Sequence, residues 1–259
     1  MHKFREAEPV GAFYHKKPIR LAVEGNMGVG KTTLLKYLQT LPDFNVLFEP
    51  VEQWRQQQGG QNLFDMYFKD LTRWSFTFQT NVLITRAQSI FEHEKSKLKK
   101  HELCGSVSLF ERSLFCDRYC FAHTQYQNGN MSPLEWALYQ NMFLWLTEDV
   151  MPSFSGLVYL RLEPEVAFQR VQKRNRFEEK IVPLGYMQQL HQKHEEWLIE
   201  KKDVPPSIKN VPVLVIDATQ DFETDKQVQA VVVETIRDFI KQLVQEKRIV
   251  ASGGVQATF

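Results

Sequence analysis

One eight-residue segment constrains the fold of this chain more than any other. Residues 25–32 read Gly-Asn-Met-Gly-Val-Gly-Lys-Thr and match the pattern G-x-x-x-x-G-K-S/T. The apolar run 19–24 before it predicts a buried strand, and the segment 31–40 after it, closed by Pro42, predicts a helix. A glycine-rich loop at that position exposes backbone N–H groups at a helix N-terminus, where they bind phosphate. The alternative is a glycine turn with an ordinary surface lysine, which the flanking strand and helix disfavour.

Short β-branched runs alternate with longer helical segments along the rest of the chain. Further strands are expected at residues 45–48, 107–110, 157–162 and 211–216. Helices are expected at residues 63–68, 73–100, 133–150, 164–174, 184–201 and about 225–247. Strands that are separated by helices need crossover connections, which indicate a parallel sheet. We therefore expect an α/β fold with a five-stranded parallel sheet, helices on both faces, and ligands beyond the carboxyl ends of the strands.

A single domain is expected over residues 18–247. The segment 1–17 is polar and the segment 248–259 contains Ser-Gly-Gly, so we expect flexible tails there.

Lys and Arg number 32 against 31 for Asp and Glu, which gives a formal net charge of +1. Proteins that bind nucleic acid through their overall charge are usually more basic, and no apolar run approaches the ~18 residues of a membrane span. Neither a nucleic acid nor a membrane is therefore expected as a partner.

The N-terminal segment lacks the apolar core of a signal peptide, and its Glu6 and Glu8 are unlike a mitochondrial transit peptide. We expect a cytosolic or nuclear protein, with a processed mitochondrial form as the alternative. The three cysteines, Cys104, Cys116 and Cys120, are an odd number without a spacing typical of metal ligands. They predict reduced thiols in a reducing compartment.

Charged side chains follow two predicted strands at the edge where the phosphate loop lies. Glu49 comes directly after the second strand, and Glu111 and Arg112 follow the third. Glu49 could accept a proton from a hydroxyl group that attacks a phosphate, and Arg112 could neutralise substrate oxygens. Hydroxyl and carboxylate oxygens bind Mg²⁺, which makes Thr32 and Glu111 the candidate metal ligands. The structural alternatives are solvated loop carboxylates and a surface ion pair.

Three arginines lie at the end of an expected helix and in the turn after it, namely Arg170, Arg174 and Arg176. The spacing of four residues puts Arg170 and Arg174 on one helix face. Such a cluster can close over a triphosphate as a lid and stabilise the charge of a transferred phosphoryl group. A solvated charged face is the more common reason for such a run, and the phosphate loop is what favours the lid.

Aromatic and polar residues near these elements are candidates for a nucleobase pocket. The aromatic ones, which at such spacing are more often core residues, are Trp54, Tyr67, Phe78, Phe115 and Phe121. Gln79 carries a donor and an acceptor for a base edge, and Arg86 and Asp117 can form an ion pair in the pocket. His191 and His194 lie three residues apart on an expected helix without an evident third ligand, so we interpret them as surface residues.

Together these motifs resemble one family, the cellular deoxynucleoside kinases, which include deoxycytidine, deoxyguanosine and mitochondrial thymidine kinases. The matching motifs are Gly-Asn-x-x-x-Gly-Lys-Thr-Thr at 25–33, Glu-Pro-Val-x-x-Trp at 49–54, Trp-Ser-Phe-Thr-Phe-Gln-Thr at 74–80, Glu-Arg-Ser-x-x-x-Asp-Arg-Tyr at 111–119 and Arg-x-x-x-Arg-x-Arg-x-Glu-Glu at 170–179. The resemblance covers about residues 19–243. It implies a P-loop kinase fold with an Arg-rich lid, and a homodimer through the long helices, for which 73–100 and 133–150 are the candidates.

The resemblance also implies a role for each matching residue. The implied ATP-binding residues are Gly25, Asn26, Met27, Gly28, Val29, Gly30, Lys31, Thr32, Thr33, Arg170, Arg174, Arg176 and Asp217, the last near the adenine. The implied nucleoside-binding residues are Glu49, Trp54, Met66, Tyr67, Phe78, Gln79, Val82, Arg86, Arg112, Asp117, Phe121 and Glu179. The implied catalytic residues are Lys31, Glu49, as base for the nucleoside 5′-hydroxyl, and Arg112 beside it. Gln79 would read the base edge, while Tyr67 and Glu179 would hold the sugar 3′-hydroxyl.

Base preference in the family follows the residues at two positions of the pocket. Members similar to deoxycytidine and deoxyguanosine kinases carry Arg and Asp where this chain has Arg86 and Asp117, whereas thymidine-preferring and broad insect members carry apolar or small residues. A charged pair there narrows the room for the thymine 5-methyl group and favours bases that carry an amino group. The departures from the family pattern are Met27, Val29, Asn81 and Val82.

The expected activity is transfer of the γ-phosphate of ATP, or of another triphosphate such as UTP, to the 5′-hydroxyl of a deoxynucleoside with Mg²⁺. It yields the 5′-monophosphate for nucleotide salvage, with deoxycytidine and purine deoxynucleosides favoured over thymidine. The alternatives are a broad-specificity or thymidine-preferring kinase, a nucleoside monophosphate kinase, and a non-catalytic structural homologue. The Glu49 carboxylate would repel an acceptor phosphate, which argues against a monophosphate kinase. Lys31, Thr32, Glu49 and Arg112 occur together, which argues against a non-catalytic homologue.

Overall fold

Five parallel strands pair in the order β2-β3-β1-β4-β5 in the computed structural model, which describes residues 18–56, 60–99, 107–174 and 182–253. The strands are β1 (Ile19–Glu24), β2 (Phe44–Leu47), β3 (Val107–Glu111), β4 (Gly156–Arg161) and β5 (Val213–Asp217). Because every pairing is parallel, the carboxyl ends of the strands lie along one edge of the sheet. The predicted α/β fold is confirmed.

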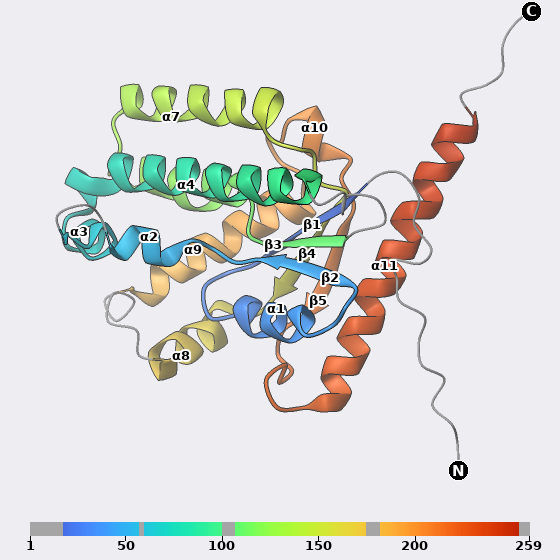
Figure 1. Cartoon of the computed structure of the whole chain (residues 1–259). Helices are drawn as coiled ribbons and strands as arrows, with labels where there is room; N and C mark the ends of the chain where they lie inside the picture. The colour runs from blue at the N-terminus through green and yellow to red at the C-terminus, as the bar shows by residue number, and fades with distance from the viewer. Residues whose placement is uncertain (1–17, 57–59, 100–106, 175–181, 254–259) are drawn as a thin grey trace, which may run out of the picture.

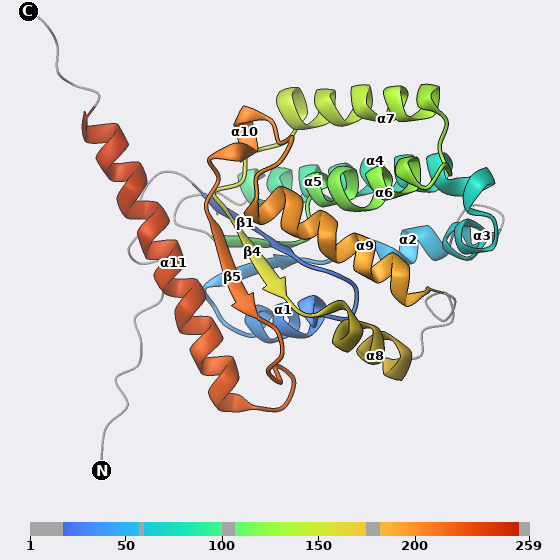
Figure 2. The ribbon, with the colours of Figure 1, turned by 180° about the vertical axis from the view of Figure 1, so that it is seen from behind.

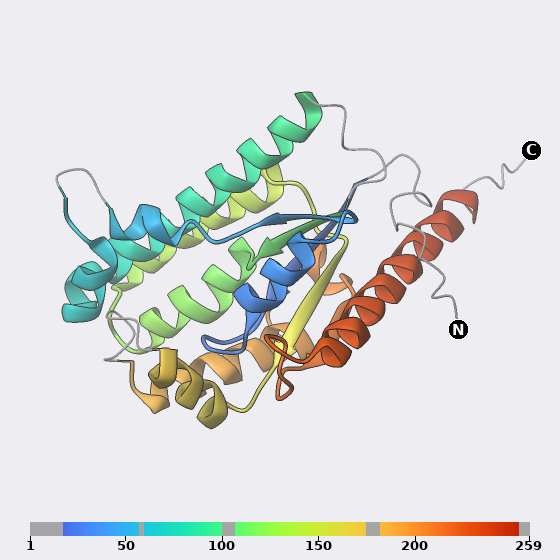
Figure 3. The same ribbon diagram turned by 60° about the horizontal axis from the view of Figure 1, so that its bottom comes forward.

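Alternate strand residues belong to two apolar cores, one on each face of the sheet. Leu21 and Val23 of β1 pack into the first core, and Ala22 between them packs into the second. The helices are α1 (Lys31–Gln39) and α11 (Lys226–Gly253) at the first core, and α4 (Leu71–Lys99), α7 (Pro133–Trp145) and α9 (Leu184–His194) at the second. Figure 1 shows α4 and α7 on one side of the sheet, and Figure 3 brings α1 and α11 on the other side to the front.

The predicted strands and helices are all present, and the strand ends shift by at most two residues. The largest difference is α11, which continues to Gly253 although we expected it to end near residue 247. The segment 248–253, expected within a flexible tail, is therefore helical. Residues 248–251 contain Arg and Ala, which favour helices, and the first glycine pair comes only at 253–254. The segments 1–17 and 254–259 lie outside the described residues.

The structure also contains helices that we did not predict. They are α2 (Val51–Arg55), α10 (Pro206–Lys209) and a segment in which α5 (Leu114–Cys116), a π-helical turn (Asp117–Ala122) and α6 (His123–Gln127) follow one another. The last segment is buried over most of its surface, and polar residues such as Asp117 and Gln125 are buried with the apolar ones, so no exposed polar face marks its period in the sequence. The other helices are α3 (Leu63–Lys69) and α8 (Pro164–Arg174). Among the described helices, none is both long and apolar enough to span a membrane.

Candidate active site

The phosphate loop joins β1 to α1 and packs against α8 and α9. Gly25 and Gly28 have φ angles of 136° and 77°, a backbone region that favours glycine. A Cβ atom on Gly28 would lie 2.5 Å from the carbonyl oxygen of Ala167 in α8. The Asn26 side chain donates from Nδ2 to the carbonyl oxygen of Met187 in α9, at 2.8 Å. Two helices therefore fix the conformation of the loop.

Lys31 is buried at the start of α1 and points back into the loop. Its Nζ donates to the carbonyl oxygens of Gly25, at 3.0 Å, and Asn26, at 2.7 Å. Burial, together with the charge of Arg112, lowers the pKa of Lys31 to about 7, although nearby carboxylates act in the opposite direction. An anion bound in the loop would raise this pKa again, because it favours the charged ammonium form.

Thr32 and Glu111, the predicted metal ligands, are in direct contact. Thr32 Oγ1 donates to Glu111 Oε1 at 2.5 Å, which joins the start of α1 to the end of β3. A hydroxyl oxygen and a carboxylate oxygen are ligands that Mg²⁺ prefers. The two side chains therefore fit a magnesium ion at the phosphate loop.

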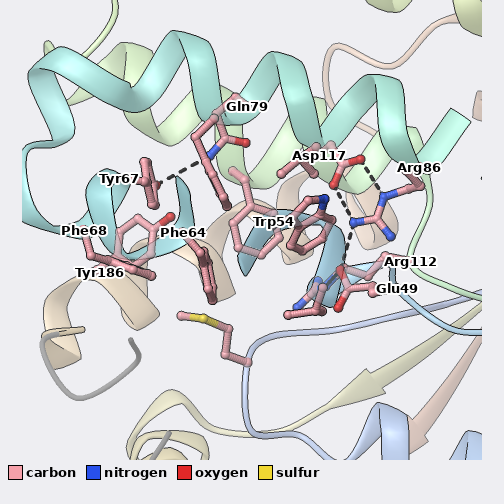
Figure 4. Close-up of a pocket in the computed structure, with 15 residues that line it drawn as sticks. Glu49, Trp54, Phe64, Tyr67, Phe68, Gln79, Arg86, Arg112, Asp117 and Tyr186 are labelled. Atoms are coloured by element: carbon pink, nitrogen blue, oxygen red, sulfur yellow. Dashed lines mark hydrogen bonds and ion pairs between the residues drawn. The ribbon is translucent and has the colours of Figure 1, made fainter. Parts of the chain in front are cut away.

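A pocket with about 640 Å³ of empty space, part of it open to solvent, lies beside the loop. Figure 4 shows that its side chains come from several elements. The predicted nucleoside-binding residues that line it are Glu49, Trp54, Tyr67, Phe78, Gln79, Val82, Arg86, Arg112, Asp117 and Phe121. Met27 of the phosphate loop also lines it, so the loop and the pocket share a wall. Glu179 lies outside the described residues.

Met66 was expected in the pocket and is not among the residues that line it. Helix α3 presents Phe64, Tyr67 and Phe68 to the pocket, at the i, i+3 and i+4 positions of one helix face. Met66 lies off that face and is half-buried elsewhere.

Glu49 lies between two arginines at one wall of the pocket (Figure 4). Its Oε1 is 2.8 Å from Arg86 Nη2 and 3.3 Å from Arg112 Nε. Arg86 also donates from Nε and Nη2 to both carboxylate oxygens of Asp117, at 2.7 and 3.0 Å. Burial raises the pKa of Glu49, but the charges of Arg86 and Arg112 outweigh burial and lower it overall. The Glu49 carboxylate is therefore ionised at neutral pH.

Arg112 has a φ angle of 65°, which residues with a side chain rarely adopt and which costs conformational energy. Several contacts hold it in place. Its backbone N–H donates to the Val23 carbonyl oxygen at 3.0 Å, and its guanidinium carbon lies 4.8 Å from the centre of the Phe121 ring. Its Nη1 donates to Cys116 Sγ at 3.1 Å. The side chain is therefore positioned beside Glu49 before any substrate binds.

The opposite end of the pocket is aromatic, with one buried amide. Phe78 stacks on Tyr67, with ring centres 4.3 Å apart. Gln79 is 1% exposed, and its Nε2 lies 3.5 Å from the Tyr67 hydroxyl. Its Oε1 has no hydrogen-bond partner within the described part of the chain. A buried acceptor without a partner costs free energy, so a ligand that donates a hydrogen bond there would be stabilised.

Arg170, one of the three predicted lid arginines, contacts the turn that follows Asp217. Arg170 on α8 donates to the carbonyl oxygens of Ala218, at 2.8 Å, and Thr219, at 3.0 Å, in the turn after Asp217. Asp217, at the end of β5, accepts a hydrogen bond from the Thr219 N–H at 2.9 Å. Arg170 therefore braces this turn. Of the other two arginines, Arg174 is exposed at the end of α8, and Arg176 lies outside the described residues.

The prediction that His194 lies on the surface is wrong. His194 is fully buried instead of lying on the surface, and it meets Cys116 and Cys120, whose spacing had not suggested a cluster. The histidine lies 78 residues along the chain from Cys116, so only the packing of α9 on the helical segment after β3 brings them together. Phe115, a candidate for the nucleobase pocket, packs in the core against Phe143, with ring centres 5.6 Å apart.

Four pocket residues were missed by sequence reasoning, namely Val51, Phe64, Phe68 and Tyr186. Phe64 and Phe68 share a helix face with Tyr67, and this spacing could have indicated them. Tyr186 follows the Pro-Leu pair at 183–184 and accepts a hydrogen bond from Gln125 Nε2 at 3.2 Å. No local pattern marks Tyr186, because α9 reaches the pocket only through the fold.

Comparison with known proteins decides the family. The deoxynucleoside kinase family model matches residues 21–241, which include the phosphate loop and the whole described pocket. The chain belongs to the deoxynucleoside kinase family. It is therefore a kinase that phosphorylates nucleosides, and its small-molecule partners are a nucleoside and a nucleoside triphosphate.

Curated relatives of this deoxynucleoside kinase are named for different nucleosides. Deoxycytidine kinase 2 of Gallus gallus is 34% identical over 90% of this chain and 95% of its own length. Mitochondrial deoxyguanosine kinase of Xenopus laevis is 36% identical over 80% and 83%. Human mitochondrial thymidine kinase 2 is 37% identical over 78% and 72%. These names agree on the kinase activity, but they differ in the nucleoside and in the compartment.

Proposed function

We propose that the chain transfers the γ-phosphate of ATP, or of another triphosphate such as UTP, to the 5′-hydroxyl of a deoxynucleoside. The position of Glu49 carries this proposal. Its carboxylate lies at the pocket wall between Arg86 and Arg112, and its backbone N–H is 3.4 Å from Glu111 Oε2 beside the phosphate loop. A hydroxyl group in the pocket would meet a proton acceptor on one side and the phosphate-binding loop on the other. Phosphoryl transfer depends on such positioning.

Glu49 is the proposed general base. It is ionised at neutral pH, so it can accept the proton of the 5′-hydroxyl as the oxygen attacks the γ-phosphate. The Arg112 guanidinium contacts the same carboxylate. We propose that it neutralises the negative charge that develops on the phosphoryl oxygens during transfer. Both side chains are held before the substrate arrives, which lowers the cost of reorganisation during the reaction.

The phosphate loop, from Gly25 to Thr33, is the proposed cradle of the donor triphosphate. When the triphosphate binds, Lys31 Nζ would donate to phosphate oxygens in place of the carbonyl oxygens of Gly25 and Asn26. Thr32 and Glu111 would hold Mg²⁺, which supplies charge stabilisation to the triphosphate when it is bound. Arg170, Arg174 and Arg176 are the proposed lid, and Asp217 lies in the proposed adenine region.

Deoxycytidine and purine deoxynucleosides are the proposed substrates in preference to thymidine. The unpartnered Gln79 Oε1 is an acceptor for an amino group on the base. Arg86 donates to Asp117, Glu49 and the Glu111 carbonyl oxygen, so it cannot easily move aside. The fixed charged pair therefore leaves less room for the 5-methyl group of thymine than small apolar side chains would, and we propose that this disfavours thymidine.

A homodimer through α4 and α7 is the proposed assembly. Figures 1 and 2 show α7 beside α4, on the side of α4 that faces away from the sheet. Exposed apolar side chains on them are Phe91, Leu98, Leu134, Leu138, Leu144 and Trp145. Exposed apolar side chains gathered on neighbouring helices are typical of protein–protein contacts. A cytosolic location also remains a proposal, based on the composition of the N-terminal segment.

Initial rates with Mg²⁺-ATP and each of the four deoxynucleosides test the proposal, with Glu49→Gln beside the wild type. We expect turnover of deoxycytidine and the purines to exceed that of thymidine. Loss of the base should reduce kcat by about 10²–10⁴-fold without unfolding the protein. Thymidine as the best substrate would support the thymidine-preferring alternative. Equal rates for Glu49→Gln and the wild type would show that another group is the base.

A further inference from the structure

Outside the nucleoside pocket, one cluster of metal-binding side chains is assembled in the protein interior. The ligand atoms of Cys116, Cys120 and His194 all lie within 4.8 Å of one another. All three residues are 0% exposed. The ligand atoms therefore converge on one position in the interior. The two cysteines come from one helical segment, four residues apart, and the histidine comes from α9.

The geometry of the histidine is that of a metal ligand. His194 Nδ1 lies 2.6 Å from the Leu190 carbonyl oxygen, which can only accept, so Nδ1 carries the proton. In the neutral ring, Nε2 then presents a lone pair, and this atom faces Cys116 Sγ at 3.6 Å. Metal-bound histidines usually donate their other N–H to a carbonyl or carboxylate in this way. Zn–S and Zn–N bonds of about 2.3 and 2.0–2.1 Å at a tetrahedral angle place S and N about 3.6 Å apart.

The charges around the cluster suit a divalent cation. Arg112 Nη1 donates to Cys116 Sγ at 3.1 Å, and such a bond stabilises a thiolate. Glu24, at the end of β1, is also fully buried. Its Oε1 accepts from Ser113 Oγ at 2.6 Å, while its Oε2 has no hydrogen-bond partner among the described residues. Two thiolates would balance the charge of a divalent cation.

We propose that Cys116, Cys120 and His194 bind one thiophilic divalent cation, with Zn²⁺ as the expected metal. Two sulfur ligands and one imidazole nitrogen form a donor set that favours zinc over Mg²⁺. Complete burial indicates a structural ion taken up during folding, and it disfavours a disulfide switch, because an oxidant in solution has no access to the sulfurs.

The site has a consequence for the kinase reaction. Cys116 contacts Arg112, which contacts Glu49, so a thiolate held by a metal would keep Arg112 in place. The three ligands are thus positioning residues for the reaction and do not touch the substrate. This site does not depend on which nucleoside is phosphorylated, because it is separate from the pocket.

Metal analysis of the full chain tests the proposal. The chain should be purified without chelator. All samples should carry Cys104→Ser, so that Cys116 and Cys120 are the two cysteines that remain. We expect one zinc per chain, and visible ligand-field and sulfur-to-metal bands typical of tetrahedral thiolate coordination when Co²⁺ replaces zinc. Cys120→Ser and His194→Gln should lose the zinc and the bands. His191→Gln, on the same helix, is the matched control and should keep both.

Zinc well below one per chain, with no cobalt bands in the folded wild-type protein, would overturn the proposal. Bands that persist at full strength in Cys120→Ser and His194→Gln would place the metal elsewhere and overturn it too. The number of free thiols per chain can be measured with and without reductant. Two thiols that become detectable only after reduction would identify a disulfide instead. If the variants fail to fold, the wild-type zinc content and cobalt spectrum alone decide the question.

Discussion

Arg86 Nη2 lies 2.8 Å from Glu49 Oε1 while the same guanidinium holds both carboxylate oxygens of Asp117. One buried arginine thus joins the proposed catalytic base to the residue proposed to set base preference. Changes at Arg86 should therefore affect both stability and the choice of nucleoside.

Replacing the pair with apolar or small residues, as Arg86→Leu with Asp117→Ala, should shift preference toward thymidine. The charged wall that opposes the 5-methyl group is removed, and removing both partners leaves no unpaired charge on Asp117. We expect the ratio of kcat/KM for thymidine to that for deoxycytidine to rise at least about tenfold. Arg86→Leu alone should lower the free energy of unfolding by ~3–5 kcal/mol, because it leaves the buried Asp117 carboxylate without its partner, whereas Glu49 keeps Arg112. An unchanged ratio in a folded double variant would contradict the assigned role.

Gly28→Ala should abolish productive binding of the triphosphate. Its Cβ would clash with the Ala167 carbonyl oxygen and strain a φ of 77°, so the loop must move away from α8. Gly129→Ala is the matched control, with a φ of 76° and nothing within 4 Å of the added Cβ. We expect kcat/KM for ATP to fall about 100-fold or more in Gly28→Ala. The control should lose about 1 kcal/mol of stability and keep its activity. Equal activities would show that the loop tolerates displacement.

His123 should contribute to acid destabilisation. Burial, with the charges of Lys193 and Arg118, lowers its pKa from 6.5 to about 4, although Glu196 and Asp203 act in the opposite direction. The unfolded chain therefore binds a proton on this residue at a higher pH than the folded chain. Stability should fall as pH drops from about 6.5 to about 4 and level off below that range, as far as this residue is concerned.

The melting temperature measured across this pH range checks the effect. His123→Gln should show a shallower loss of melting temperature than the wild type. A slope that is identical in the two proteins would mean that His123 takes up its proton equally well in the folded state.

Leu138→Glu together with Trp145→Glu should convert the proposed dimer to monomers. Both side chains are exposed on α7, and a charge at an apolar contact must lose its water without a partner. Sedimentation equilibrium gives the mass directly. Val231→Glu, at another exposed apolar position on α11, should leave the mass unchanged. A wild-type protein that is monomeric at the highest concentration used would refute the proposed assembly.

Local patterns in the sequence are sufficient to predict the strands, the phosphate loop and the charged residues after β2 and β3. Each of these depends on neighbours in the chain, such as the glycines around Lys31 or the position of Glu49 after a strand. The same holds for the start of α8 at Pro164, which the structure places where we expected it.

Features that depend on distant segments were not predictable in this way. Tyr186 reaches the pocket, and His194 reaches Cys116, only because α9 packs on the helical segment after β3. The contact of Arg86 with Glu49 joins residues 37 positions apart, and nothing in either local sequence indicates it. Helical segments that are buried all round, such as the one containing Asp117, also lack the polar face that would reveal their period.

Helix α8 touches both ends of the proposed donor site. Its Ala167 and Val171 lie against Gly28, and its Arg170 holds the backbone of Ala218 and Thr219. The contacts with the loop and with the turn come from residues 167–171, within about one turn of α8, so the helix links the two directly. A shift of α8 on phosphate binding at the loop would therefore also displace the turn after Asp217, the proposed adenine region, and a shift of that turn would displace the loop. Inorganic triphosphate and adenosine should therefore each alter the affinity for the other without touching one another.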